Sequence, residues 1–238
     1  MVCDLIKDLI ERTIDEFKAV YKFRELTLFA FYIIREKLTK LKESPITFNY
    51  SEHTNIGLST EKISPGSLPN ILESYEKHYA NELCLQYIVS IFENFVFDLM
   101  KDIMIKYPKQ LNEQKEIKVG IITNQNSMDE LIYLLIDQEL SALKYKNLKD
   151  WIDRLKKMVS ITGPSTDEVK KISEIKATRD LLVHNKGIVD ETYIKKAGKL
   201  ARYKKGERIE VSYDYFLSSW GLLLNVTHKI ATEVIQTF

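Results

Sequence analysis

In the stretch "SIFENFVFD" (Ser90–Asp98), apolar residues recur at the spacing of an α-helix. The stretch belongs to a longer helical pattern, residues 70–107, which stops at Pro108. Proline has no backbone N–H and its ring clashes with the preceding turn, so a helix ends before it. The pattern therefore predicts one long apolar helix that packs in the core of the protein.

Further helical patterns lie on both sides of this segment. Capping-box sequences begin two of them, at Ser127 and at Ser165, because a serine side chain can accept the N–H of the third residue after it. Asp190 is suited to cap another helix, and Gly187 to a left-handed position just beyond a helix end. The predicted helices are residues 4–42 (as one helix or two), 70–107, 127–144, 147–159, 165–186, 190–198 and 212–237.

Extended structure is expected at only a few places. Residues 43–70 contain several proline and glycine turn signals and are expected to form a loop with room for a short strand. The β-branched residues in Glu116–Asn124 indicate a short strand or an extended link. Residues Ala201–Tyr213 are expected to form a small hairpin with Lys205–Gly206 near its turn. We therefore predict an all-α helical bundle with at most a small β-hairpin near residues 200–213.

The composition agrees with one helical domain. The 238 residues are 45% hydrophobic, enough for a sizeable core, and the 8 glycines and 5 prolines are few for a turn-rich β fold. We predict a single domain over residues 1–238, with a helical extension and loop at 1–70 before a core at 71–238. The formal net charge is only +1, so any contact with nucleic acid must come from a local basic patch.

Neither a secretion signal nor a membrane span is expected. Charged residues interrupt the apolar N-terminal run "MVCDLIKDLIER". The longest uncharged apolar stretch, Leu26–Ile34, is about half of the roughly 18 residues that a membrane span needs. The cysteines, Cys3 and Cys84, are isolated from each other, which favours a reducing compartment and gives no zinc motif. We therefore expect a cytoplasmic protein without a membrane partner.

Common cofactor and metal motifs do not occur in the sequence. It has no glycine-rich phosphate-binding loop, no dinucleotide-binding fingerprint and no nucleophile elbow. No two of the four histidines lie at metal-ligand spacing, and no carboxylate cluster joins them. We therefore expect neither a metal nor a cofactor, and we expect surface or capping roles for three of the histidines, His53, His78 and His228.

The stretch "TRDLLVHNKGIVDETY" (Thr178–Tyr193) contains the fourth histidine, His184, five residues after Arg179. In a structural interpretation, Arg179 is a solvated helix residue and His184 interacts with the last carbonyls of its helix. In a chemical interpretation, the helix ends close to His184, so that both side chains reach one phosphate-sized site. The apolar residues between them would anchor the pair to the core.

The segment "RDLLVHNKG" resembles the Arg-x(4–6)-His motif of HEPN domains (higher eukaryotes and prokaryotes nucleotide-binding), in which Asn, Asp or His typically follows the arginine. Asp180 takes that position here. The extension "VHNKGIVDETY" is similar to larger HEPN-like proteins of bacterial toxin and defence systems, such as the RiboL-PSP-HEPN type. The likeness covers about residues 75–235 in layout and 178–193 in motif.

The resemblance implies a metal-independent endoribonuclease that acts as a homodimer. It implies acid–base catalysis by His184, phosphate or transition-state binding by Arg179, an orienting role for Asp180 and a supporting role for Asn185. Some HEPN toxins carry a tyrosine two residues after the histidine, which their antitoxin modifies. This chain has Lys186 there, so the resemblance does not extend to that kind of antitoxin.

The chemistry of RNA cleavage suits these residue types. RNA supplies its own nucleophile, the 2′-OH, and cleavage needs a base, an acid and a cation for the charge on phosphorus. Histidine has an unperturbed pKa of about 6.5, which suits the first two roles, and arginine suits the third through its fixed donor fork. One motif supplies one histidine, so a two-fold dimer with facing motifs would supply both acid and base.

A basic stretch after the motif is the expected RNA contact, and Tyr203 within it offers a stacking surface. The alternative is a solvated helix-and-turn surface. Glu93 could face Arg179 as a supporting residue, although it also borders a polar stripe on its own helix. The stretch Lys144–Lys157 is also basic, but acids interrupt it. The predicted RNA-binding residues are Lys186, Lys195, Lys196, Lys199, Arg202, Tyr203, Lys204 and Lys205.

We therefore predict a HEPN-type endoribonuclease that acts as a toxin or defence effector, with RNA, a second copy of the chain and a cognate antitoxin or defence protein as partners. The alternative is a non-catalytic helical module of the same fold that binds RNA or a protein.

Overall fold

The computed structural model describes residues 2–38, 45–48, 61–111, 120, 122 and 125–238. The described chain is almost entirely helical, which confirms the all-α prediction. Its helices are α1 (Val2–Leu38), α2 (Leu68–Ser74), the π-helix η2 (Tyr75–Ala80), α3 (Asn81–Lys106), the 3₁₀ turn η3 (Pro108–Gln110), α5 (Met128–Lys144), α6 (Leu148–Met158), α7 (Thr166–His184), α8 (Glu191–Ala197), the 3₁₀ turn η4 (Gly198–Leu200) and α9 (Tyr213–Thr237).

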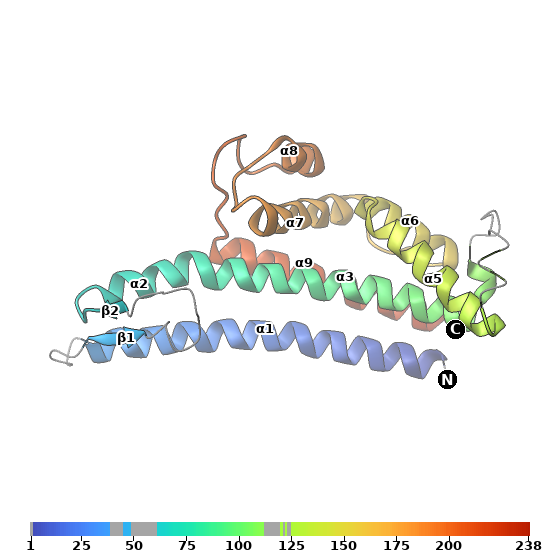
Figure 1. Ribbon diagram of the computed structural model, residues 1–238, viewed down its shortest axis with the longest axis horizontal. Helices are drawn as coiled ribbons and strands as arrows, with labels where there is room; N and C mark the ends of the chain where they lie inside the picture. The colour runs from blue at the N-terminus through green and yellow to red at the C-terminus, as the bar shows by residue number, and fades with distance from the viewer. Residues whose placement is uncertain (1, 39–44, 49–60, 112–119, 121, 123–124) are drawn as a thin grey trace.

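Three long helices form the base of the molecule. In Figure 1, α1 lies below α3 and runs in the opposite direction, while α9 lies behind α3 and packs against both α3 and α1. The shorter helices α5, α6 and α7 cover α3 from above, and α8 lies on the outer side of α7. The motif helix α7 is thus placed between the long helices and α8.

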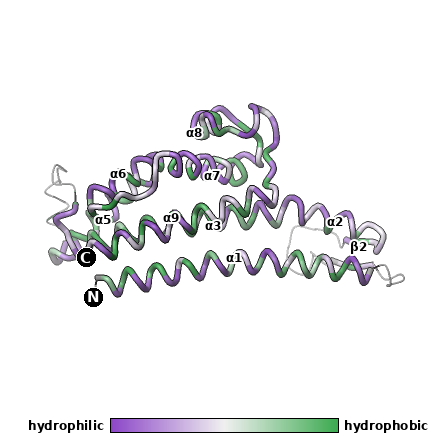
Figure 2. Tube along the Cα trace, turned by 180° about the vertical axis from the view of Figure 1, so that it is seen from behind, coloured by the Kyte–Doolittle hydropathy of each residue, from purple (hydrophilic) through white to green (hydrophobic). Residues whose placement is uncertain are grey.

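The main core lies between the long helices, and α3 is its centre. Its buried side chains include Phe92, Phe95 and Leu99, and they form one cluster with Phe17 of α1 and Phe216 of α9. Figure 2 shows hydrophobic and hydrophilic residues alternating along α1, as expected for a helix with one face on a core. Because α1 contributes to this cluster, the helical part of the predicted extension packs as part of the main core.

The helical pattern predicted for residues 70–107 forms α2, η2 and α3 in direct succession, and it ends at Lys106 before Pro108. By length and composition alone, the continuous helix Leu68–Lys106 is apolar enough to cross a membrane. However, 61% of its most apolar window is buried inside the protein. The helix therefore has the character of a core helix, and the fold is compatible with a soluble protein.

The predicted caps account for several helix starts. Ser127 accepts the Glu130 N–H at 3.1 Å, although the Glu130 carboxylate bonds the Asn126 N–H and not that of Ser127. The box at Ser165 is complete, because its hydroxyl accepts the N–H of Glu168 and the Glu168 carboxylate accepts the N–H of Ser165. These bonds satisfy N–H groups that have no partner within the helix.

The predicted cap of the short helix α8 is also confirmed, because Asp190 accepts the Tyr193 N–H at 2.7 Å. At the end of α7 the left-handed conformation begins one residue earlier than expected, at Lys186 (φ 53°), and continues at Gly187 (φ 76°).

The position of the small β element differs from the prediction. The two-stranded antiparallel sheet pairs β1 (Ile46–Phe48) with β2 (Glu61–Ile63), within the loop expected to hold a short strand. Residues Ala201–Tyr213 turn near Gly206 as expected, but they do not form a hairpin. Instead their backbone pairs with the segment after α7. The Val189 N–H donates to the Glu207 carbonyl, and the Ile209 N–H donates to the Gly187 carbonyl. This pairing between distant segments replaces the local one.

The predicted strand or link at Glu116–Asn124 lies outside the described residues except for Gly120 and Ile122, which are helical. His53 also lies outside them. A second, smaller core lies under α8, where Tyr193 and Ile209 pack against Leu181 of α7. The two clusters together fix both faces of α7, the helix that carries the motif.

Candidate active site

The last two turns of α7 hold the motif in a fixed orientation. Thr178 and Leu181 are buried, so they anchor this part of the helix, whereas Arg179 and Asp180 are only half-buried. The helix ends at His184, which is exposed. Beyond it, the N–H groups of Asn185 and Gly187 both donate to the Leu181 carbonyl at 2.9 Å, and they close the helix end.

Arg179 is held by carboxylates on two sides. One terminal nitrogen donates to Glu93 of α3, and the other lies 3.3 Å from Asp180. The Arg179 side chain is only 15% exposed, and its Nε is buried with no hydrogen-bond partner in the described part of the chain. Of the two interpretations of Glu93, the contact with Arg179 is the one seen, and the guanidinium keeps donors that a bound anion could use.

Glu93 also binds Lys176, one turn before Arg179 on α7. The Lys176 ammonium lies 5.0 Å from the centre of the Trp151 ring, a cation–π contact that holds this lysine beside α6. The sequence did not single out Lys176, although its i, i+3 spacing from Arg179 places both on one helix face. One carboxylate therefore orients two cations.

Asp180 connects the motif to α8. Its second oxygen accepts a hydrogen bond from Lys196 at 3.0 Å, while its first faces Arg179. Glu93, Arg179, Asp180 and Lys196 thus form a chain of alternating charges that joins α3, α7 and α8. This arrangement fits the orienting role expected for Asp180.

These residues line a cleft of about 1260 Å³. Arg179, Asp180, His184 and Asn185 all contribute to its wall. Its lysines come from three regions of the chain and outnumber its carboxylates, so the cleft is locally basic although the chain is almost neutral. The lysines that line it are Lys144, Lys146, Lys149, Lys176, Lys195 and Lys196.

His184 is the last residue of α7 and is exposed at the cleft. In the part of the chain that the structure describes, its imidazole makes no hydrogen bond or ion pair, so the expected interaction with the last carbonyls of α7 is not seen. Asn185 instead stabilises the turn after the helix, where its amide donates to the Ile188 carbonyl at 2.6 Å. The histidine is therefore available to a molecule in the cleft.

The predicted RNA-binding residues separate into two groups. Lys195 and Lys196 line the cleft. Lys205 is exposed outside it and pairs with Glu191 at 2.8 Å, and Tyr203 is half-buried beside the smaller core. The remaining lysines of the prediction do not line the cleft and are exposed: Lys186, Lys199 and Lys204.

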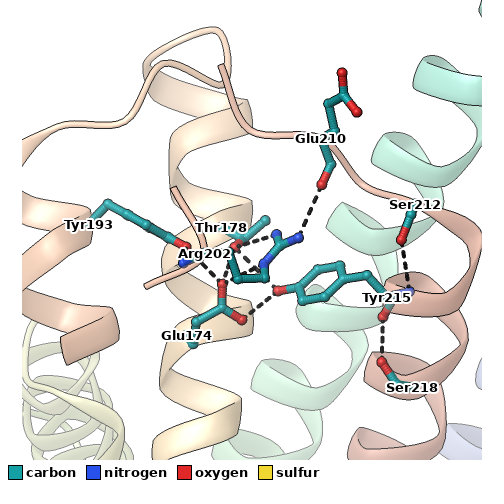
Figure 3. A network of polar contacts seen from close by, with 8 residues as sticks. All are labelled: Glu174, Thr178, Tyr193, Arg202, Glu210, Ser212, Tyr215 and Ser218. Atoms are coloured by element: carbon teal, nitrogen blue, oxygen red, sulfur yellow. Dashed lines mark hydrogen bonds and ion pairs between the residues drawn. The ribbon is translucent and has the colours of Figure 1, made fainter. Parts of the chain in front are cut away.

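Arg202 is half-buried, and its guanidinium points into a network of polar side chains (Figure 3). Its guanidinium donates to Glu174 of α7 at 3.1 Å and stacks on the Tyr215 ring with 3.4 Å to the ring centre. A further terminal nitrogen donates to the Glu210 carbonyl. Because these partners already occupy the guanidinium, Arg202 is better explained as a structural residue than as an RNA ligand.

Glu174 is the centre of this network, and sequence patterns gave no sign of it. Its carboxylate is 5% exposed and accepts hydrogen bonds from the Tyr193 and Tyr215 hydroxyls at 2.9 and 2.7 Å (Figure 3). Burial raises the pKa of both tyrosines, and the nearby Glu174 charge adds to the effect at Tyr215. The network fastens α8 and the 201–211 segment to α7 and α9.

Among the described residues, no group of three or more His, Cys, Asp or Glu side chains could hold a metal ion. Comparisons with models of protein families, with curated proteins and with solved structures gave no significant match.

Proposed function

We propose that this protein is a metal-independent endoribonuclease of the HEPN type, acting in the cytoplasm as a toxin or defence effector. The observation that carries the proposal is that Arg179 and His184 line one basic cleft. An arginine fixed by carboxylates and a histidine open to the cleft are two of the three groups that cleavage by the 2′-OH requires.

In the proposed reaction, a histidine accepts the proton of the 2′-OH while the 2′-oxygen forms a bond to phosphorus. The bond from phosphorus to the 5′-oxygen breaks, and a second protonated histidine donates a proton to that leaving oxygen. Arg179 binds the phosphate through donors that Glu93 and Asp180 do not occupy. The products carry a 2′,3′-cyclic phosphate and a 5′-hydroxyl.

The second histidine is proposed to come from a second copy of the chain. Exposed Tyr79 at the end of η2 and exposed Leu83 and Tyr87 on α3 form a stripe at i, i+4 spacing, and exposed Val183 precedes His184 on α7. An exposed apolar stripe is a common feature of interfaces. Since α7 runs antiparallel to α3 and Arg179 lies at Glu93, His184 extends toward the half of α3 that carries the stripe.

The test is cleavage of single-stranded RNA by the purified protein in excess EDTA. We expect cyclic-phosphate and 5′-hydroxyl ends. His184→Ala should reduce the rate by about 10²–10⁴, the usual contribution of acid–base catalysis, and should leave the melting temperature unchanged because the side chain is exposed. Cleavage that stops on chelation, or that survives in His184→Ala, would rule out the mechanism.

A second candidate is a non-catalytic module that binds RNA or a protein. The ion pairs of Arg179 with Glu93 and Asp180 favour it, because an arginine held in this way can serve the fold alone. In that case the wild type and His184→Ala would bind RNA equally and cleave none.

A further inference from the structure

Tyr145 occupies an unusual position for an aromatic residue. It is the C-cap residue that follows α5, in the corner between α5 and α6, and it is 94% exposed. It is more exposed than any other large hydrophobic side chain of the described chain. Aromatic rings normally bury most of their surface, so a ring with both faces in water has no role in the core of this molecule.

The corner that carries Tyr145 is firmly held. The Lys146 N–H and the Trp151 indole both donate to the Leu143 carbonyl, at 2.9 and 2.7 Å. Asn147 caps α6 in a complete capping box, with 3.0 Å from its side-chain oxygen to the Asp150 N–H. The exposed ring is therefore presented by a rigid backbone.

Tyr145 also lies on the wall of the candidate cleft, together with Arg179 and His184. Lysines flank it on both sides in the sequence, and Lys144 and Lys146 line the same wall. The lysines of α8 lie on the cleft too. The cleft thus has an aromatic ring between two lysines at one part and further lysines at another. This arrangement suits a single strand of nucleic acid, whose phosphates bind cations and whose bases stack on aromatic rings.

We propose that Tyr145 is a stacking platform for an unpaired base, so that the cleft takes a single strand of RNA between the α5–α6 corner and α8. This inference rests on the proposed function and specifies its substrate. A duplex keeps its base faces covered, so only an unpaired base can stack on the ring. The cations on either side of Tyr145 in the sequence would bind the adjoining phosphates.

The experiment measures binding of a labelled RNA of about ten nucleotides, within the usual site size of such grooves, by fluorescence anisotropy at fixed salt. All proteins carry His184→Ala so that the RNA stays intact. A second probe has the same backbone with the bases removed. The variants are Tyr145→Ala, Tyr145→Phe and, as the control, Tyr133→Ala, which removes an exposed tyrosine of α5 outside the cleft.

We expect Tyr145→Ala to weaken binding of the normal RNA about tenfold, since stacking of one base is worth about that much. Tyr145→Phe and Tyr133→Ala should bind as the parent does, and Tyr145→Ala should bind the base-free probe as tightly as the parent. Equal weakening of both probes, or none with the normal RNA, would overturn the inference.

The outcomes for the two proposals differ. If wild-type protein cleaves RNA while Tyr145→Ala has no effect on binding, the stacking role fails and the ribonuclease stands. If Tyr145→Ala weakens binding as expected but the wild type cleaves no RNA, the stacking role stands and the ribonuclease fails. Absence of any RNA binding by the parent would overturn the stacking role. The cleavage assay in EDTA would then decide on the ribonuclease independently.

Discussion

Glu93 and Arg179 form an ion pair across 86 positions of the sequence, and the same carboxylate binds Lys176. The two cations are on one helix and the carboxylate is on another, so this contact fixes the rotation of α7 relative to α3. Since all three side chains are mostly buried, a change at Glu93 affects both the packing of these helices and the charge inside the cleft.

Glu93→Gln should destabilise the protein while it increases affinity for RNA. The amide keeps the shape but leaves Lys176 without its carboxylate partner and Arg179 with Asp180 alone, at a cost of about 1–3 kcal/mol. That cost corresponds to roughly 2–10 °C in melting temperature. RNA affinity should rise because a carboxylate that competes with phosphate is lost. The matched control, Glu73→Gln, breaks the exposed pair with Lys77 and should change neither quantity. Weaker RNA binding by Glu93→Gln would contradict the competition argument.

Glu174→Gln should be among the most destabilising conservative substitutions. It leaves Arg202 without its buried counter-ion, and it replaces one of the two oxygens that accept hydrogen bonds from three other side chains with an NH2 group. We expect a loss of about 1–3 kcal/mol in the free energy of unfolding, measured by urea denaturation. Ser218→Ala, which removes an exposed hydrogen bond to the Tyr215 carbonyl, is the control and should stay within about 0.5 kcal/mol of the parent. Equal stabilities would show that the network is dispensable.

Alkaline pH should destabilise the fold. Burial raises the pKa of the Cys84 thiol from its ordinary value near 9 to about 11, so the unfolded chain loses this proton first. The stability is thus fully present below about pH 9 and is lost as pH rises from about 9 to 11. The melting temperature should fall by roughly 2–4 °C between pH 9 and pH 10. Cys84→Ala should show a smaller fall over this interval, and an equal fall would assign the effect to other groups.

An active site shared by two copies of the chain predicts a dimer whose subunits can be exchanged. Light scattering should give about twice the chain mass of 27.8 kDa. His184→Ala and Arg179→Ala should each be inactive alone, and mixing them should restore part of the activity as mixed dimers form. A protein that is monomeric at nanomolar concentration and still fully active would exclude a shared site.

Features set by near neighbours in the sequence were predictable. The caps at Ser165 and Asp190 and the end of the long helix before Pro108 need only a few residues of context. The contact of Glu93 with Arg179 was only one of two interpretations, because the same residue also borders a polar stripe on its own helix. The placement of both motif residues on one cleft followed from the end of α7 at His184.

Features set by distant pairing were not predictable. Nothing near Ala201–Tyr213 indicates that this segment bonds to residues 187–189 and not to itself, so a local hairpin was the natural expectation. Arg202 lies in a basic stretch and gave no sign that Glu174, 28 positions earlier, binds it. The role of Glu174 depends on four donors from separate turns and helices, which no spacing rule in one helix can express.

The chain leaves the body of the protein after Gly187 and returns to the same point at Ile209, where the two backbones are joined at 2.8 Å. Between these points, α8 packs on the small core that it shares with the last turns of α7. A segment closed at its neck and held to the rest by one small core can open as one cooperative unit while the rest stays folded. In hydrogen exchange, the amides of α8 should therefore exchange together and sooner than those of α3. Such an opening would carry Lys195 and Lys196 away from the cleft and leave Arg179 in place.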